Sequence, residues 1–160
     1  MIIGYKCFNK GLINRYGKKF IIGQIYHVDK NVSFGNNKHG FHMCVNLEDT
    51  LRYFDSENIE IAEVIGFGNY ELMEDEYNGF YDMYAVENLI IRKILSRDEI
   101  INYALNINEF RVQRFLQLFV LSEEEKLLFK EKYKDNKTIL DIISYYQYHN
   151  LDTYTRKLKK

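Results

Sequence analysis

The spacing of apolar residues changes near residue 96, and no other feature of the sequence constrains the fold as strongly. Before that point, apolar residues alternate with polar ones or form β-branched runs that end at Gly, Asn or Asp, which is typical of strands. After it, they recur every three or four residues, which is typical of helices with one buried face. This order predicts an α+β fold. We expect a β-rich domain over residues 1–95 and a helical extension over residues 96–160 that packs on it.

The first half of the chain predicts one mostly antiparallel sheet and one short helix. Five runs have strand character: residues 2–8, 20–28, 40–44, 59–67 and 84–93. Between the third and fourth runs, Asn46 is followed three residues later by Asp49, an arrangement typical of a helix start. Leu47, Leu51 and Phe54 then follow at helical spacing. We therefore predict a short amphipathic helix between these two strands.

The second half predicts about four helices. Three helix starts carry a hydroxyl followed three residues later by an acid: Ser96 with Glu99, Ser122 with Glu125, and Thr138 with Asp141. In this arrangement the hydroxyl accepts a hydrogen bond from the third helical amide, and the acid side chain accepts one from the backbone amide of the hydroxyl-bearing residue. A further apolar stripe lies between the first two starts, at Val112, Phe115, Leu116 and Phe119. Its spacing predicts the additional helix.

The composition excludes several classes of protein. The 160 residues hold 22 Lys and Arg against 23 Asp and Glu, a net charge of −1, which argues against a polycation that coats nucleic acid. No apolar run approaches the roughly 20 residues that cross a bilayer, and the amino terminus lacks a targeting pattern. Cys7 and Cys44 are too few for a disulfide-stabilised secreted domain. We expect a soluble cytoplasmic protein with no membrane or nucleic-acid partner.

The charge is unevenly distributed along the chain. Residues 1–47 hold seven bases and one acid, residues 48–87 one base and twelve acids, and residues 88–160 fourteen bases and ten acids, so the segments carry +6, −11 and +4. The acidic segment includes Glu71, Glu74, Asp75 and Glu76. Two interpretations stay open: a solvated loop, or an acidic surface that attracts a basic protein partner.

The residues that carry chemistry form no complete catalytic or metal motif. His39, His42 and Cys44 resemble a partial zinc site, but a closed zinc site needs four ligands, so we expect no metal. A core thiol beside a hydrogen-bonded histidine is the alternative that we favour. The sequence contains no phosphate-binding Gly-Lys-Ser/Thr loop, no dinucleotide fingerprint and no Gly-x-Ser-x-Gly elbow. We therefore expect no cofactor.

Three short motifs occur in a recognisable order: Tyr5-Lys6-x-Phe8, Gly40-Phe41-His42-x-Cys44, and Ala62-Glu63-Val64 after a helix that ends at Tyr53. This order resembles an uncharacterised domain of phage and giant-virus proteins that often precedes pentapeptide repeats. The resemblance covers about residues 3–100, and two positions depart from it, Met43 for an aromatic and Ile65 for a second glutamate. It points to four motif side chains as binding residues: Tyr5, Lys6, His42 and Glu63.

The order of strands and helix is also similar, more loosely, to the ADP-ribosyltransferase plan. That plan uses an opening His or Arg, a middle Tyr or Ser and a late Glu to bind NAD and stabilise an oxocarbenium-like transition state. The similarity implies Lys6, Tyr53 and Glu87 in these three roles, with NAD as the cofactor.

Three functions follow as hypotheses. The first is a small accessory protein of viral or phage type that binds a protein partner through the sheet domain, against a host defence or regulatory system, in the host-cell cytoplasm. The second is the NAD-dependent transferase. The third is a homo-oligomeric structural protein that associates through the stripe containing Val112 and Phe119.

Overall fold

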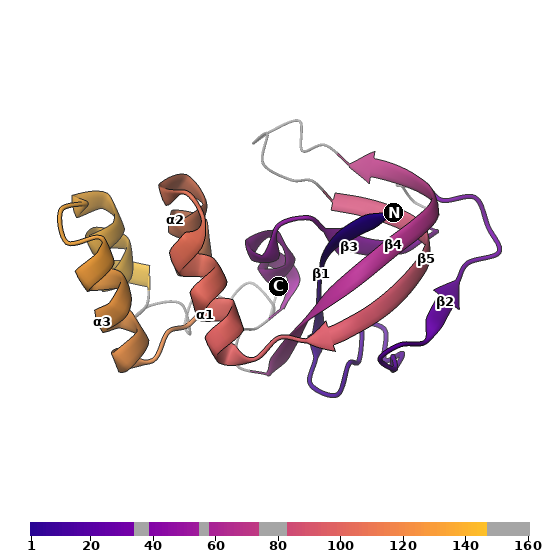
Figure 1. Ribbon diagram of the computed structural model, residues 1–160, viewed down its shortest axis with the longest axis horizontal. Coiled ribbons are helices and arrows are strands. Elements are labelled where there is room, and N and C mark those ends of the chain that lie inside the picture. Colours follow the sequence, from indigo (N-terminus) through magenta and orange to yellow (C-terminus); the bar gives the residue numbers. More distant parts are fainter. Residues whose placement is uncertain (34–38, 55–57, 74–82, 147–160) are drawn as a thin grey trace, which may run out of the picture. The chain divides into compact units, whose positions relative to one another are not determined.

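The structure is a computed structural model that describes residues 1–33, 39–54, 58–73 and 83–146 (Figure 1). The described residues form two compact units, an antiparallel sheet with a short helix up to Leu95 and a set of helices from Ser96 onward. The α+β prediction is therefore confirmed. The packing of the helical residues on the sheet stays a prediction. No helix in the described part of the chain is both long and apolar enough to cross a membrane.

All strand pairs in the sheet unit are antiparallel. The strands are β1 (Ile2–Asn9), β2 (Ile25–His27), β3 (Phe41–Cys44), β4 (Ile59–Met73) and β5 (Met83–Ile94). The pairings close a ring: β1 pairs with β4, β4 with β5, β5 with β3, and β3 returns to β1 where Cys44 lies opposite Tyr5. Two irregularities in the β4–β5 register, after Glu63 and after Phe67, allow these long strands to bend around the ring.

The inner face of the ring holds a hydrophobic core. Its buried residues come from the strands and from the segment that precedes β2: Phe8, Leu12, Phe20, Tyr26, Met43, Ala62, Val64, Val86, Leu89 and Ile91. Two glycines make room for the Met43 side chain. A β-carbon at Gly4 would meet the Cys44 carbonyl oxygen and lie 2.8 Å from Met43 Cε, and one at Gly66 would lie 2.7 Å from Met43 Sδ. The ring therefore closes because β1 and β4 carry no side chain at these points.

The predicted strand over residues 20–28 is wrong for its first half. Gly23 has φ of +80°, and the Gln24 amide donates to the Ile21 carbonyl, so the chain turns here and only Ile25–His27 forms a strand. The turn is held to the sheet by the Gly23 amide, which donates to the Ile91 carbonyl at 2.9 Å. A Gly in the left-handed region breaks an apolar run that otherwise has strand character.

The predicted short helix is present as the 3-10 helix η1 (Leu47–Tyr53). The sequence predicted that the Asn46 side chain would cap this helix by accepting from a backbone amide, and the structure shows no such hydrogen bond. The Asn46 side chain instead donates to the Asp49 carboxylate at 3.3 Å. Thr50 Oγ1 donates to the Leu47 carbonyl at 2.7 Å. Leu47 and Leu51 are both buried, so the helix holds its apolar side chains away from solvent.

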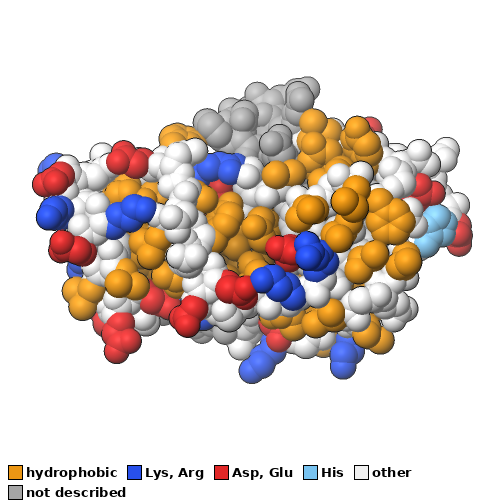
Figure 2. Space-filling view, viewed as in Figure 1, with side chains coloured by type: hydrophobic (Ala, Val, Ile, Leu, Met, Phe, Trp, Pro, Cys, Tyr) orange, Lys and Arg blue, Asp and Glu red, His pale blue; other side chains and the backbone are white. Residues whose placement is uncertain are grey.

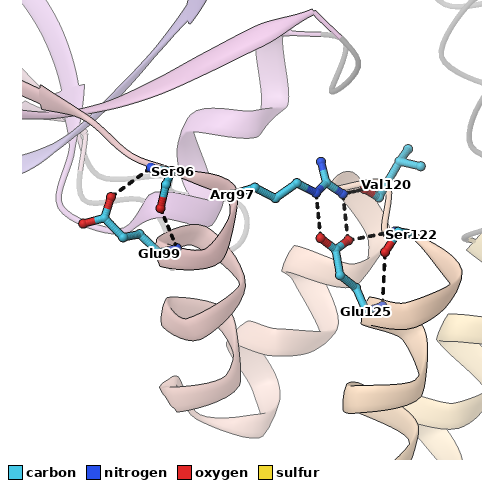
Figure 3. Close-up of polar contacts among 6 residues, drawn as sticks. All are labelled: Ser96, Arg97, Glu99, Val120, Ser122 and Glu125. Carbon is cyan, nitrogen blue, oxygen red and sulfur yellow. Dashed lines mark hydrogen bonds and ion pairs between the residues drawn. The ribbon is translucent and has the colours of Figure 1, made fainter.

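The helical unit contains α1 (Arg97–Asn106), α2 (Glu109–Leu118), α3 (Glu123–Lys132) and a fourth helix over 137–146, where the described residues end. The first two predicted capping boxes are confirmed: Ser96 with Glu99 and Ser122 with Glu125 (Figure 3). The third predicted start is wrong. Asn136 precedes the fourth helix and its Oδ1 accepts from the Ile139 amide, which leaves Thr138 inside the helix.

The apolar stripe of the helical unit is buried in the single chain. Val112, Phe115, Leu116 and Phe119 are each at most 2% exposed. The Phe115 ring stacks on the rings of Phe119 and Phe129, with centroid distances of 4.9 and 6.3 Å. Intramolecular packing therefore occupies the surface that the sequence had suggested for homo-oligomerisation.

One ion pair links the start of α1 to the first turn of α3. Arg97 Nε and Nη2 donate to the two Glu125 oxygens at 2.7 and 2.8 Å, and Arg97 Nη2 also donates to the Val120 carbonyl (Figure 3). Glu125 Oε2 accepts from the Ser122 amide as well. The hydrogen bond from Arg97 is the main cause of the lowered pKa of Glu125.

We predict that Gly66→Ala lowers the free energy of unfolding by about 1–3 kcal/mol, because the added methyl group overlaps Met43 and Val86. Met43→Ala opens part of that space. The double variant should therefore be less destabilised than the sum of the two single variants in urea unfolding. Strictly additive values would show that Gly66 does not accommodate Met43.

We predict that Glu125→Ala destabilises the protein by about 1 kcal/mol at neutral pH, because it removes a cap and a half-exposed ion pair. Glu124→Ala, in the same helical turn and exposed, is the control and should change stability by less than about 0.5 kcal/mol. Because the pKa of Glu125 is lowered in the folded state, the difference between the variants should shrink as the pH falls through that pKa. Equal stabilities at neutral pH would contradict the prediction.

Candidate functional site

A cavity of about 340 Å³ in the sheet unit brings together three of the four predicted binding residues, Tyr5, Lys6 and His42. Strands β1 and β3 supply these side chains and both cysteines, and the segment before β2 supplies a second wall. Lys6 belongs to the same face of β1 as Phe8, because side chains alternate along a strand. The motif Tyr5-Lys6-x-Phe8 therefore places one residue in the core and one at a cavity.

Lys6 is held by neutral groups. Its Nζ donates to the His42 carbonyl at 2.6 Å and lies 5.7 Å from the centroid of the Phe8 ring. Burial lowers the pKa of Lys6 to about 8. Within the described residues, Lys6 forms no ion pair with a carboxylate. The Lys6 ammonium is therefore stabilised only by neutral groups among the described residues.

Two cysteines and a tyrosine also line this cavity, at Cys7, Cys44 and Tyr5. Burial raises the pKa of Cys7 to about 12, so its thiol stays protonated at neutral pH. Cys7 and Cys44 are both buried free thiols. Burial, followed by the charges of Glu63 and Glu48, raises the pKa of Tyr5. The Lys6 side chain at this cavity therefore lies near a Cys7 thiol that is protonated at neutral pH.

The residues implied by the transferase similarity do not share one cavity. Glu87 lines a second cavity of about 370 Å³ with His27, Asn69 and Tyr70, and its Oε2 accepts from the Asn69 amide at 2.8 Å. Lys6 lines the first cavity. Tyr53 ends η1, and its side chain lies outside the described residues. The NAD-dependent assignment stays a prediction.

Of the acidic residues predicted for binding, the structure describes Glu63 and Glu71. Glu63 is on the outer face of the ring, where Oε1 lies 3.0 Å from Arg92 Nη1. Glu71 is exposed near the end of β4, and Glu74, Asp75 and Glu76 lie outside the described residues. For the partial zinc motif, no group of three or more His, Cys, Asp or Glu side chains in the described ranges is placed to hold a metal ion.

The outer face of the ring carries an apolar row that the sequence did not predict. Four isoleucines lie directly opposite one another across four neighbouring strands, in the order Ile3, Ile65, Ile90 and Ile25. Ile3 and Ile25 are 51% and 60% exposed, and the two central residues are partly exposed. Figure 2 shows hydrophobic side chains gathered on the surface of β4 and β5. We call these four residues the isoleucine row.

Polar side chains border the isoleucine row on both sides. Toward one side, the Glu63–Arg92 ion pair follows on β4 and β5. Toward the other, Asn88 Oδ1 lies 2.8 Å from His27 Nδ1 on β2. An apolar centre with a polar border is the usual composition of a protein–protein interface. β-branched runs predict strands but not their register, so only the observed pairing reveals this row.

Comparison with known proteins gives one family. Residues 2–80 match the model described as Domain of unknown function (DUF7666). The sheet unit therefore resembles an uncharacterised domain, over a shorter range than the motifs had indicated. The comparisons with curated proteins and with solved structures found no match.

We predict that Lys6 deprotonates with a midpoint near pH 8, because burial disfavours its charged form. In protein labelled with ¹³C at the lysine ε carbons, one NMR signal should titrate near this pH, and Lys6→Met should remove that signal. Exposed lysines should titrate near their ordinary value of about 10.4. Titration of every lysine near that value would contradict the burial of the Lys6 ammonium.

Proposed function

We propose that this protein is a small accessory protein of viral or phage type that acts as a protein-binding module, and that it binds its partner through the isoleucine row. The observation that carries the proposal is the exposure of four cross-strand isoleucines on one face of the ring. Burial of exposed aliphatic side chains is the main driving force of protein association. Contiguous apolar patches on a folded surface are typical of interaction sites.

The geometry of the row favours one kind of partner surface. Neighbouring strands lie about 4.8 Å apart, so a row across four strands is about 14 Å long. The apolar stripe of an amphipathic helix covers the same length in about ten residues. The partner that we propose presents such a helix across the strands, with charged residues of both signs on its flanks opposite Glu63, Arg92 and His27.

The biological setting follows from the motif resemblance to phage and giant-virus proteins. A small binding module without a complete catalytic motif suits the inhibition of a host defence or regulatory protein by stoichiometric binding. We place this activity in the host-cell cytoplasm, with the helical residues from Ser96 onward extending the contact surface.

A paired substitution tests the docking surface. Ile3→Lys with Ile25→Lys introduces two charges at the most exposed ends of the row, and should lower partner recovery by about tenfold or more in affinity capture from infected or host cells. Leu127→Lys, at a residue 65% exposed on α3, is the matched control and should leave recovery unchanged. Thermal unfolding of each variant verifies that the fold is intact.

A photoactivatable residue at position 25 identifies what occupies the row. Cross-linking from position 25 to one partner at a one-to-one ratio, with none from position 127, is the expected result. Cross-links solely between copies of this chain would replace the proposal with self-association. Recovery of only substoichiometric species, or equal loss with Leu127→Lys, would contradict it.

A further inference from the structure

The cavity beside β1 and β3 contains a second lysine, Lys18, which packs over aromatic rings. Lys18 Nζ lies 5.4, 5.2 and 5.8 Å from the ring centroids of Phe20, Tyr26 and Phe41. These three rings contact one another, with Phe20 at 4.6 Å from Tyr26 and 6.2 Å from Phe41. Among the described residues, Lys18 has no carboxylate within ion-pair distance. Aromatic faces attract an ammonium group without cancelling its net charge.

A short loop fixes Lys18 at the cavity wall. Asn14 Oδ1 accepts from the amides of Tyr16 and Lys18, each at 2.9 Å. The Gly17 amide donates to the Asn14 carbonyl, and the Asn14 amide donates to the Lys18 carbonyl. Gly17 has φ of +84°, which closes the loop. Four hydrogen bonds within five residues therefore hold the backbone that presents Arg15 and Lys18 to the cavity.

The described cavity wall includes three basic side chains. Lys6, Arg15 and Lys18 all line it, and its described lining includes neither Asp nor Glu. Lys6 uses one of the three donors of its ammonium group, in the hydrogen bond to the His42 carbonyl. Lys6 is partly buried and Lys18 is exposed at the rim, so their positive charges favour an anion in this cavity.

Most of the exposed wall surface is apolar, and part of it is flexible. Phe20, Phe41 and Phe54 contribute rings, and Met43, Met73 and Met83 contribute flexible thioether side chains. The volume of about 340 Å³ is within the range of small-molecule sites. Few polar anchors in a mainly apolar wall are the usual composition of such a site.

We propose that this cavity binds a small organic anion, in which one phosphate or carboxylate group contacts Lys6 and Lys18 and an apolar body of about ring size lies against the Phe and Met side chains. This site is on the core side of the sheet, because Lys6 shares its strand face with Phe8, whereas the isoleucine row is on the outer face. The proposal is therefore independent of the proposed protein-binding function and is tested with the isolated chain.

Isothermal titration with four probes tests the ligand class. Phenyl phosphate carries a phosphate and a ring, benzoate a carboxylate and a ring, inorganic phosphate no ring, and benzyl alcohol no charge. At least one of the first two should bind about tenfold more tightly than both of the others. The tighter of the two distinguishes a phosphate from a carboxylate ligand. No binding, or equal binding of inorganic phosphate, would overturn the proposal.

Charge-removing variants locate the bound probe. Lys18→Met and Lys6→Met should each weaken binding by about tenfold. Lys19→Met is the matched control, because it removes the same charge next to Lys18 at a residue that does not line the cavity; it should change affinity by less than about twofold. NMR spectra should show ring signals of Phe20 and Phe41 that shift on titration. Equal weakening by Lys19→Met, or shifts elsewhere alone, would overturn the assignment even if Lys6→Met fails to fold.

Discussion

Closure of the ring around Met43 is the constraint on which the sheet unit depends. Strand β3 has four residues and meets β1 at a single residue pair, so few hydrogen bonds hold these strands together. The missing side chains at Gly4 and Gly66 let the backbone approach Met43 and the Cys44 carbonyl closely. An unbranched thioether adapts to the irregular space that remains. A β-carbon at either glycine would separate the strands and displace β3, and with it His42 and one wall of the Lys6 cavity.

Residues of one short motif lie in different parts of the ring. In β1, Phe8 is buried in the core, Lys6 lines the cavity and Ile3 is exposed on the outer face. In β3, Met43 is buried in the core and also borders the cavity beside His42. Side chains alternate along a strand, so Ile3 is on the outer face of β1 whereas Lys6 and Phe8 share the inner face. The motif residues are therefore partly architecture and partly cavity wall, which the sequence order alone does not distinguish.

Local signals in the sequence predicted the elements well, and spatial relationships poorly. The capping boxes at Ser96 and Ser122 act within four residues, so their prediction needs no tertiary information. The turn at Gly23 was missed because its left-handed φ is invisible in an apolar run. Tyr5, Lys6 and His42 line one cavity, and Lys18 joins them through a loop whose three-dimensional path the pattern does not encode. Glu87 lies one residue beyond Val86, the β5 residue that pairs with Phe41 of β3, yet it lines a different cavity.

Strand propensity alone does not account for the isoleucine row. Exposed strand positions favour β-branched residues, so a single exposed isoleucine needs no functional explanation. Threonine would give a similar backbone preference without placing apolar surface in water. Four directly opposed isoleucines form a continuous stripe, whereas the polar side chains Glu63, Arg92 and Asn88 occupy neighbouring positions on the same face. This separation of apolar centre and polar border favours selection for contact with another surface over the effect of strand propensity.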